Sequence, residues 1–262
     1  MTSEQRQLAK MIIDAGPGGT VALTGAGIST PSGIPDFRGK GGLWEQYDPM
    51  EVAHIDVFRH DPERFWRFYR QRLDITEGID PNRAHQVLVE LEQQGYLAGI
   101  ITQNIDGLHT RAGSQVVHEV HGSVRTLSCP GPRCRKTFSR EQVQSLFASD
   151  DGVPYCPSCL YDFDLRQPLK PDVVLFGELL PVDTMDSAYA LSQEARLMLC
   201  VGSSLVVQPV GSLPELVLQH HGTLAVINSG ETPYDQQATI KLSSDVADEL
   251  DGVAEALKAL QS

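Results

Sequence analysis

One residue after the short apolar run Val21–Leu23 comes the stretch Gly25-Ala26-Gly27-Ile28-Ser29-Thr30-Pro31-Ser32-Gly33-Ile34-Pro35-Asp36-Phe37-Arg38-Gly39. The apolar run predicts a buried parallel strand, and glycines behind it let the backbone approach a ligand closely. Free amides at a following helix start would hold a phosphate pair. The third glycine of the usual dinucleotide fingerprint is replaced by Thr30, and a Pro-Asp-Phe-Arg segment stands where a helix should continue. The loop therefore indicates nucleotide binding without hydride transfer.

Six apolar runs are the candidate strands, and amphipathic helical patterns separate several of them. The candidate strands are Thr20–Leu23, Gly99–Thr102, Val117–Val120, Val173–Phe176, Leu197–Val201 and Leu224–Ile227. The candidate helices are Ser3–Ala15, Ala84–Gln94, Asp183–Glu194, Gly211–His220 and Asp245–Leu260. This alternation predicts an α/β fold in which helices cover both faces of a Rossmann-like parallel sheet. Ligands of such sheets lie at the carboxyl ends of the strands, so the site is expected in the loops there.

Two stretches interrupt the alternation of strands and helices. Residues 39–82 have a helical pattern with an aromatic cluster, and residues 123–167 carry two pairs of cysteines. We therefore expect a discontinuous sheet domain made of residues 1–38, 83–122 and 168–262. A cofactor loop with a helical lobe (39–82) and a small zinc-binding module (123–167) would be inserted in it. A chain of 262 residues is long enough to bury a core of this size.

The composition limits the class of partner and the compartment. The net charge of −13 argues against a nucleic-acid partner, because no basic stripe is present to replace counterions on a phosphate backbone. No apolar run reaches membrane-spanning length, and the first residues lack the apolar centre of a signal peptide. Cysteines in close pairs suit metal binding in a reducing compartment. A cytoplasmic location without membrane contact is expected.

The cysteine spacing is that of a structural metal site. Cys129 and Cys134 are followed by Cys156 and Cys159, so two short loops each present two thiolates. Four soft ligands close a tetrahedral shell around zinc and leave no open position for catalysis. The alternatives are four unrelated thiols or a redox Cys-x-x-Cys pair. The fifth cysteine, Cys200, lies within an apolar run and is expected to be a buried core residue.

Polar side chains gather after the second candidate strand. Gln103, Asn104 and Asp106 place two amides and a carboxylate at one strand end, with Ile105 between them. Such groups can hold a carboxamide and ribose hydroxyls. Taken alone, Asn104 or Asp106 is as well explained by helix capping.

His121 is the candidate catalytic residue. It ends the strand that begins at Val117, stands beside Gly122, and precedes the cysteine module. A side chain at such a strand end can face a cleft. His54, His85, His109 and His118 lack this placement and are expected to be structural or on the surface.

Together these motifs resemble those of the sirtuin (Sir2-like) family of NAD-dependent protein deacylases, in its bacterial and archaeal form. The matching stretches are Gly25–Gly39, Thr102–His109, His121–Gly122, the four cysteines, Lys170–Glu178, Gly202–Pro209 and Ile227–Pro233. They follow one another over most of the chain. The resemblance implies an NAD-binding sheet domain, a zinc module and a helical lobe, with an acyl-lysine peptide bound in the cleft between them.

The resemblance also assigns roles to individual positions. His121 matches the general base. The NAD contacts that it implies are Gly25, Ala26, Gly27, Asp36, Phe37, Arg38, Gln103, Asn104, Ile105, Asp106, Gly202, Ser203, Ser204, Asn228, Asp245 and Val246. The positions that match the substrate-binding strands are Val174, Phe176, Gly177, Glu178 and Val207. The implied reaction consumes NAD and converts acyl-lysine into free lysine, nicotinamide and an O-acyl-ADP-ribose.

Tyr69 and Arg72 are the residues that indicate which acyl group the site accepts. They lie three residues apart in a helical pattern and so share a face. The pair resembles the Tyr-x-x-Arg signature of sirtuins that remove succinyl or malonyl groups, and Arg suits bidentate carboxylate binding. Ala53 would leave room nearby. The equally weighted alternative is an aromatic core helix whose arginines face solvent.

Three other functions remain open at this point. A nicotinamide-dependent oxidoreductase would need the third fingerprint glycine and an acidic residue ending the second strand, and neither is evident. A non-catalytic zinc-ribbon module would leave His121 without a role. Mono-ADP-ribosyl transfer uses the same cofactor pocket and differs only in its product. The sequence does not indicate the physiological substrate or the oligomeric state.

Overall fold

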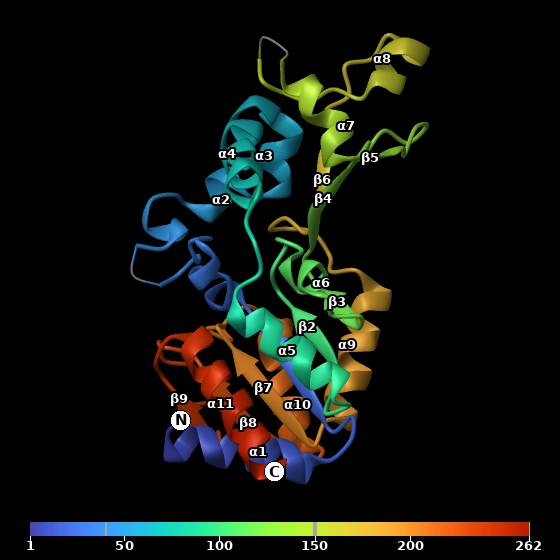
Figure 1. Cartoon of the computed structure of the whole chain (residues 1–262). Helices are drawn as coiled ribbons and strands as arrows, with labels where there is room; N and C mark the ends of the chain where they lie inside the picture. The colour runs from blue at the N-terminus through green and yellow to red at the C-terminus, as the bar shows by residue number, and fades with distance from the viewer. Residues whose placement is uncertain (40, 149–150, 262) are drawn as a thin grey trace.

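The computed structural model of the chain describes residues 1–39, 41–148 and 151–261 (Figure 1). Its larger part is a six-stranded parallel sheet in the order β3-β2-β1-β7-β8-β9. The strands are β1 (Thr20–Thr24), β2 (Leu97–Thr102), β3 (Val117–Glu119), β7 (Leu197–Val201), β8 (Thr223–Ile227) and β9 (Ile240–Leu242). β1 and β7 are buried along their whole length, as the continuous apolar runs predict.

Helices cover both faces of this sheet. The helices on one face are α1 (Ser3–Ala15), α5 (Arg83–Gln93) and α11 (Val246–Gln261), and those on the other are α9 (Val182–Glu194) and α10 (Leu213–Gln219). Side chains alternate along β1, so that Ala22 joins the first core while Val21 and Leu23 join the second. The predicted Rossmann-like α/β fold is confirmed. We call this unit, with the short α6 (Leu108–Ala112), the sheet domain.

The rest of the chain forms a second unit, which we call the small domain. Its antiparallel sheet has the order β5-β4-β6, and the strands are β4 (Gly122–Ser128), β5 (Thr137–Ser139) and β6 (Lys170–Val173). Its helices are α2 (Pro49–Val52), α3 (Ile55–His60), α4 (Pro62–Thr76), α7 (Arg140–Gln144) and α8 (Pro157–Phe163). In Figure 1 these helices and strands lie together at the end of the molecule away from both termini.

One hydrophobic core joins the helical lobe to the cysteine-bearing segment. It contains Phe65 and Trp66 from α4 together with Leu127, Cys129 and Val143. The Trp66 indole N–H donates to the Leu169 carbonyl at 3.1 Å, and Arg140 Nη1 donates to the Thr76 hydroxyl at 3.0 Å. The two insertions therefore pack as one body.

One expected strand of the parallel sheet is wrong, and one strand of that sheet is not predicted. Residues Val173–Phe176 do not form a strand of the parallel sheet, because β6 ends at Val173 and pairs antiparallel with β4. An apolar run indicates burial and does not identify the pairing partner. The edge strand β9 was not anticipated, because Ile240–Leu242 is short and interrupted by Lys241.

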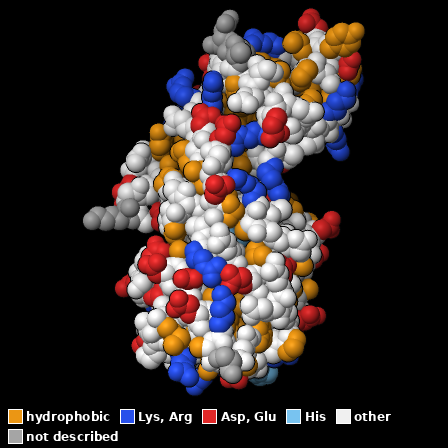
Figure 2. Space-filling view, viewed as in Figure 1, with side chains coloured by type: hydrophobic (Ala, Val, Ile, Leu, Met, Phe, Trp, Pro, Cys, Tyr) orange, Lys and Arg blue, Asp and Glu red, His pale blue; other side chains and the backbone are white. Residues whose placement is uncertain are grey.

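The surface in Figure 2 mixes both signs of charge, with acidic and basic side chains lying side by side. Hydrophobic side chains gather at the end that carries α8, where Leu160, Tyr161, Phe163 and Leu165 are exposed. Among the described helices, none is both long and apolar enough to cross a bilayer.

Candidate active site

The glycines of the first loop bring two strand ends together. The Gly27 amide donates to the Gly202 carbonyl at 2.8 Å, across the loops that follow β1 and β7. A Cβ on Gly25 or Gly27 would lie 2.8 Å from the Gly202 backbone, and Gly202 itself has a φ of +60°. The expectation of a free amide at a helix start is therefore wrong at Gly27. A 3₁₀ helix, Ala26–Ser32, follows in place of the α-helix of a dehydrogenase.

A cavity of about 1180 Å³ opens where these loops meet the small domain. It is lined by His121 and by all but one of the predicted ligand-binding residues. Those residues are Gly25, Ala26, Gly27, Asp36, Phe37, Arg38, Tyr69, Arg72, Gln103, Asn104, Ile105, Val174, Phe176, Gly177, Glu178, Gly202, Ser203, Ser204, Val207, Asn228, Asp245 and Val246. The exception, Asp106, lines a much smaller adjoining cavity that shares Asn104 and Ile105 with the first.

His121 stands in the turn that joins β3 to β4. Its Nδ1 lies 3.1 Å from the carbonyl oxygen of Gln103. Because a carbonyl only accepts, Nδ1 carries the proton of the neutral ring and Nε2 is left as the acceptor. Burial lowers the pKa of His121, the nearby Arg38 lowers it further, and the bond to Gln103 opposes both. The imidazole is therefore neutral at pH 7 and able to take a proton.

The loop after β2 is held by a chain of hydrogen bonds. Asn104 Nδ2 donates to Ser29 Oγ at 3.1 Å, and Ser29 Oγ donates to Asp106 Oδ2 at 2.7 Å. The other Asp106 oxygen accepts from the amide of Leu108, the first residue of α6, at 2.9 Å, although the N-cap of this helix is Gly107 and not Asp106. Gln103 Nε2 donates to Ser203 Oγ at 2.8 Å, which ties this loop to the one after β7.

The segment Asp36–Gly39 forms a loop over the cavity. Asp36 accepts the Gly39 amide at 2.9 Å and so fixes the loop itself. The Phe37 ring stacks on Trp44 with centroids 5.1 Å apart, and the Arg72 guanidinium carbon lies 5.0 Å from the same ring. Partial burial lowers the pKa of Arg38.

Tyr69 and Arg72 point from α4 into the cavity. Both side chains are buried, so the alternative of a solvent-facing arginine fails for Arg72, whereas Arg67 and Arg70 are exposed. Within the described part of the chain, Arg72 Nη1 is buried and has no hydrogen-bond partner. Burial raises the pKa of Tyr69, and the small side chain of Ala53 also lines the cavity.

The segment Val174–Glu178 forms one wall of the cavity. The Val174 amide donates to the carbonyl of His121 at 2.8 Å, and the Phe176 amide donates to that of Ala53 at 3.0 Å. Among the described residues, none bonds to the Val174 carbonyl or the Gly177 amide. These two groups are free to pair with an extended chain.

Several lining residues were not predicted. They are Thr30, Gly39, Trp44, Phe68, Val173, Leu175, Leu179, Leu180, Gln208, Pro209, Ser229, Gly230, Glu231, Ser243 and Ser244. Ser243 and Ser244 follow the unanticipated β9, so recognising that strand would have located them. Trp44 and Phe68 line the cavity because of how the helical lobe packs, and no local sequence pattern predicts that packing.

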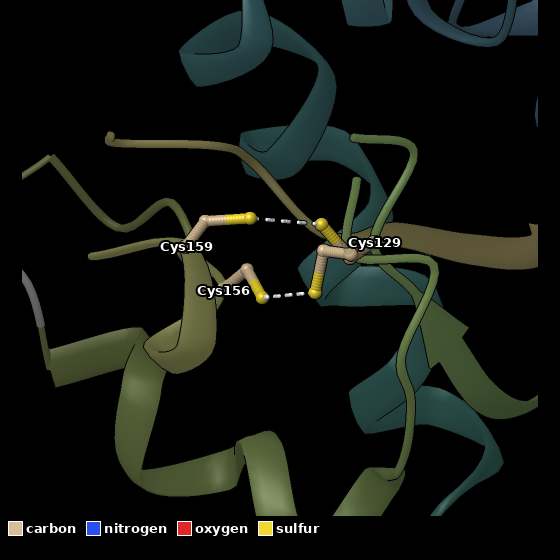
Figure 3. Close-up of side chains that lie close together, drawn as sticks. Cys129, Cys156 and Cys159 are labelled. Carbon is tan, nitrogen blue, oxygen red and sulfur yellow. Dashed lines mark hydrogen bonds between the residues drawn. The ribbon is translucent and has the colours of Figure 1, made fainter. Parts of the chain in front are cut away.

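The four cysteines fit one zinc ion. Their ligand atoms all lie within 4.8 Å of one another, with Cys129 Sγ 3.5 Å from Cys159 Sγ and Cys134 Sγ 3.6 Å from Cys156 Sγ. Zn–S bonds of about 2.3 Å require a tetrahedral edge of about 3.8 Å, close to both distances. Figure 3 shows the sulfur of Cys129, just after β4, facing that of Cys159 in α8, with Cys156 beside them. All five cysteines are unpaired, and Cys200 is buried as expected.

The remaining histidines lie outside the cavity lining. His85 and His109 are buried with ring centroids 4.9 Å apart, and His109 Nε2 bonds to the Thr24 hydroxyl at 2.9 Å. His54 Nδ1 accepts the Asp56 amide at the start of α3. Their contacts are those of structural residues.

A parallel sheet with glycine loops at its strand ends, a neutral imidazole in a deep cavity and a remote cysteine tetrad define a dinucleotide-using α/β enzyme with a structural metal site. The Sir2 family model matches residues 25–209. A deacetylase from Thermotoga maritima, described as an NAD-dependent protein deacetylase, is 45% identical over 87% of this chain and 89% of its own length. An NAD-dependent protein deacylase from Archaeoglobus fulgidus is 42% identical over 88% and 90%.

Solved structures agree. A Sir2 complex with a p53 peptide and NAD⁺ superposes with a TM-score of 0.86 at 40% identity, covering 100% of both chains. A second, with a deacetylated p53 peptide and 3′-O-acetyl ADP-ribose, has a TM-score of 0.88 at 41% identity and covers 96% of this chain and 98% of its own. The chain belongs to the Sir2 family of NAD-dependent protein deacylases.

Proposed function

We propose that the chain removes acyl groups from lysine side chains of proteins, consuming NAD and producing nicotinamide, O-acyl-ADP-ribose and free lysine. The observation that carries the proposal is the neutral His121 ring, whose Nδ1–H is held by the Gln103 carbonyl while its Nε2 has no hydrogen-bond partner among the described residues. This ring shares one cavity with the glycine loops and with the free backbone groups of Val174 and Gly177.

Bound NAD supplies a ribose carbon that loses nicotinamide and then accepts the acyl-lysine oxygen. His121 Nε2 would take a proton from a ribose hydroxyl, whose oxygen then attacks the acyl carbon, and the Gln103 carbonyl would hold the resulting imidazolium by its Nδ1–H. One water molecule, admitted after nicotinamide is lost, would then free the lysine amine while the acyl group stays on the ribose. The depressed pKa of His121 keeps the ring in its basic form at neutral pH. Phe37, steadied by Trp44, closes over the reacting carbon and excludes water.

The two ends of NAD go to different loops. Asn104, Ile105 and Asp106 line or adjoin the small cavity next to the main one, which suits the nicotinamide carboxamide. The adenosine half lies along the loops after β7, β8 and β9, where Ser203, Asn228 and Asp245 line the cavity.

The acyl-lysine peptide pairs with the Val174–Glu178 segment as an added strand. The Val174 carbonyl would accept from the substrate and the Gly177 amide would donate to it, and Val207 lines the same cavity. Backbone pairing gives affinity with little demand on flanking side chains, so several proteins with acylated lysines can serve.

A second candidate activity is removal of acyl groups that end in a carboxylate, such as succinyl or malonyl. Arg72 carries a buried cationic nitrogen without a hydrogen-bond partner among the described residues, and it lies in the cavity with Tyr69. An unpartnered buried charge is costly, and a carboxylate would satisfy it. Arg72→Met should lower kcat/KM for a succinyl-lysine peptide by at least about tenfold and leave an acetyl-lysine peptide within about threefold. Equal succinyl activity in both proteins removes Arg72 from the acyl pocket.

The division into a discontinuous NAD domain, a cofactor loop with a lobe, and a zinc module stays part of this proposal.

The proposal also includes a cytoplasmic location, which is supported by five unpaired cysteines that suit a reducing compartment.

Mass spectrometry of the products formed from NAD and a panel of acyl-lysine peptides tests the function. O-acyl-ADP-ribose and free lysine are expected, whereas an ADP-ribosylated peptide would support the transferase alternative. His121→Ala should retain zinc and its melting temperature but lose deacylation by about 10²–10⁴-fold, the usual worth of a general base. Near-wild-type NAD consumption by this variant would refute the role of His121.

A further inference from the structure

Lys170 is a partly buried cation at the start of β6 that does not line the cavity. Its Nζ donates to the Val173 carbonyl at 2.7 Å and to the Pro171 carbonyl at 3.2 Å, and it pairs with Glu178 Oε2 at 2.9 Å. The exposed fractions of the Lys170 and Glu178 side chains are only 17% and 26%. The ammonium group therefore has three acceptors drawn from both ends of one nine-residue segment.

Glu178, at the other end of this segment, forms hydrogen bonds back to Leu175. The same Oε2 that faces Lys170 accepts the Leu175 amide at 2.9 Å, and the Glu178 amide donates to the Leu175 carbonyl at 3.0 Å. The carboxylate of Glu178, which the sequence assigns to substrate binding, is therefore already engaged within the protein.

Some backbone groups of this segment already form hydrogen bonds within the protein, and others do not. The Val173 carbonyl is taken by Lys170, the Val174 amide by His121 and the Leu175 amide by Glu178. Besides the Gly177 and Glu178 carbonyls, the groups of this segment without a partner among the described residues are the Val174 carbonyl and the Gly177 amide, and both Val174 and Gly177 line the cavity. Those are the two groups assigned above to the substrate backbone.

We propose that Lys170 is a positioning residue for the acyl-peptide: by gathering Val173 and Glu178 around its ammonium group, it presents the Val174 carbonyl and the Gly177 amide as a preformed edge for the substrate. This inference rests on the proposed function. Because none of its hydrogen bonds or ion pairs within the described residues reaches the NAD loops or the His121 side chain, the loss of Lys170 should weaken peptide binding and spare the cofactor. Charge-assisted hydrogen bonds to buried groups are strong enough for a large effect.

Lys170→Met removes the charge and keeps the length of the side chain. It should raise KM for an acyl-lysine peptide at least about tenfold, with kcat within about threefold and the Kd for NAD within about twofold of wild type. Lys170→Arg should restore most of the affinity. Lys258→Met is the matched control, because Lys258 pairs with Glu90 on an exposed helix face and should leave all three constants unchanged.

Glu178→Gln provides a second variant should Lys170→Met melt early or lose zinc. It retains an acceptor for the Leu175 amide but loses the ion pair, and an intermediate rise in peptide KM is expected. A peptide KM within twofold of wild type in folded Lys170→Met overturns the inference. Equal losses of NAD and peptide affinity also overturn it, since they indicate a general folding role. Wild type that deacylates no acyl-peptide refutes the proposed function instead.

Discussion

The sheet domain and the small domain reach stability in different ways. β1 and β7 are buried throughout and are sandwiched between two apolar cores built from long helices. The small domain has strands of three to seven residues, and three of its four cysteine ligands are fully buried within its single core. We therefore expect burial alone to stabilise the first, whereas the second should depend on a bound ion. His121 lies at the joint between them, where β3 of one sheet passes into β4 of the other.

Zinc removal is the strongest test of this difference. A structural zinc contributes about 10–16 kcal/mol to small metal domains, so a chelator should abolish amide-exchange protection in β4, β5 and α4. Protection in β1, β7 and β8 should persist. Hydrogen exchange followed by mass spectrometry with and without chelator measures both regions in one sample.

Cysteine variants provide the matched control for zinc removal. Cys129→Ser should lose zinc and reproduce the chelator result, and deacylation should disappear with it. Cys200→Ala, in the core strand β7, should retain the metal and lose only part of the overall stability. Chelated protein in which the small domain stays protected would contradict the comparison.

Truncations of buried side chains sharpen the comparison between the sheet domain and the small domain. Phe65→Ala in the small domain should cost about 3–5 kcal/mol with zinc bound, and Leu199→Ala in the sheet domain about 2–5 kcal/mol. Without zinc, the Phe65 substitution should have almost no further effect on denaturant unfolding, because its surroundings are already unfolded. The Leu199 cost should be unchanged. A full Phe65 effect in the metal-free protein would show that the lobe folds without the ion.

The smallest expected effect is a pH dependence confined to the sheet domain. Burial lowers the pKa of His85 to about 4, and burial and His85 together lower that of His109. The unfolded state then binds more protons than the folded state between about pH 4 and 6.5, so the free energy of unfolding rises with pH in this window. Above pH 6.5 the contribution is complete.

His85→Leu tests this pH dependence, since both ring nitrogens of His85 lack a partner among the described residues. Denaturant unfolding with saturating zinc, measured from pH 5.5 to 7.5, should show a shallower slope in the variant than in wild type. Identical slopes would mean that the pKa of His85 is the same in the folded and the unfolded protein, which would contradict the lowered value.

The sheet domain and the small domain also differ in how well the sequence predicts them. β1, β2, β7 and β8 were located within a few residues because continuous apolar runs between helical patterns have one common interpretation. The Val173–Phe176 run was assigned to the wrong sheet, since its partner β4 lies some fifty residues earlier along the chain. The cysteine spacing predicted the tetrad because ligand geometry is local.

Site prediction shows the same limit. The cavity brings together the residues of strand-end loops, where position along the chain implies position in space. The sequence does not show that the Gly27 amide already donates to the Gly202 carbonyl, or that the Glu178 carboxylate pairs with Lys170. Those facts depend on which backbone groups a neighbouring segment takes, and no sequence pattern states that.

The placement of the two tryptophans gives the molecule separate optical reporters. Trp44 stacks on Phe37 at the cavity wall, and Trp66 is buried in the core that surrounds the cysteines. Fluorescence from a Trp66→Phe protein would follow ligand entry, and fluorescence from a Trp44→Phe protein would follow metal loss. The chain thus carries its own paired probes for timing cosubstrate capture against integrity of the metal-dependent part, without any attached dye.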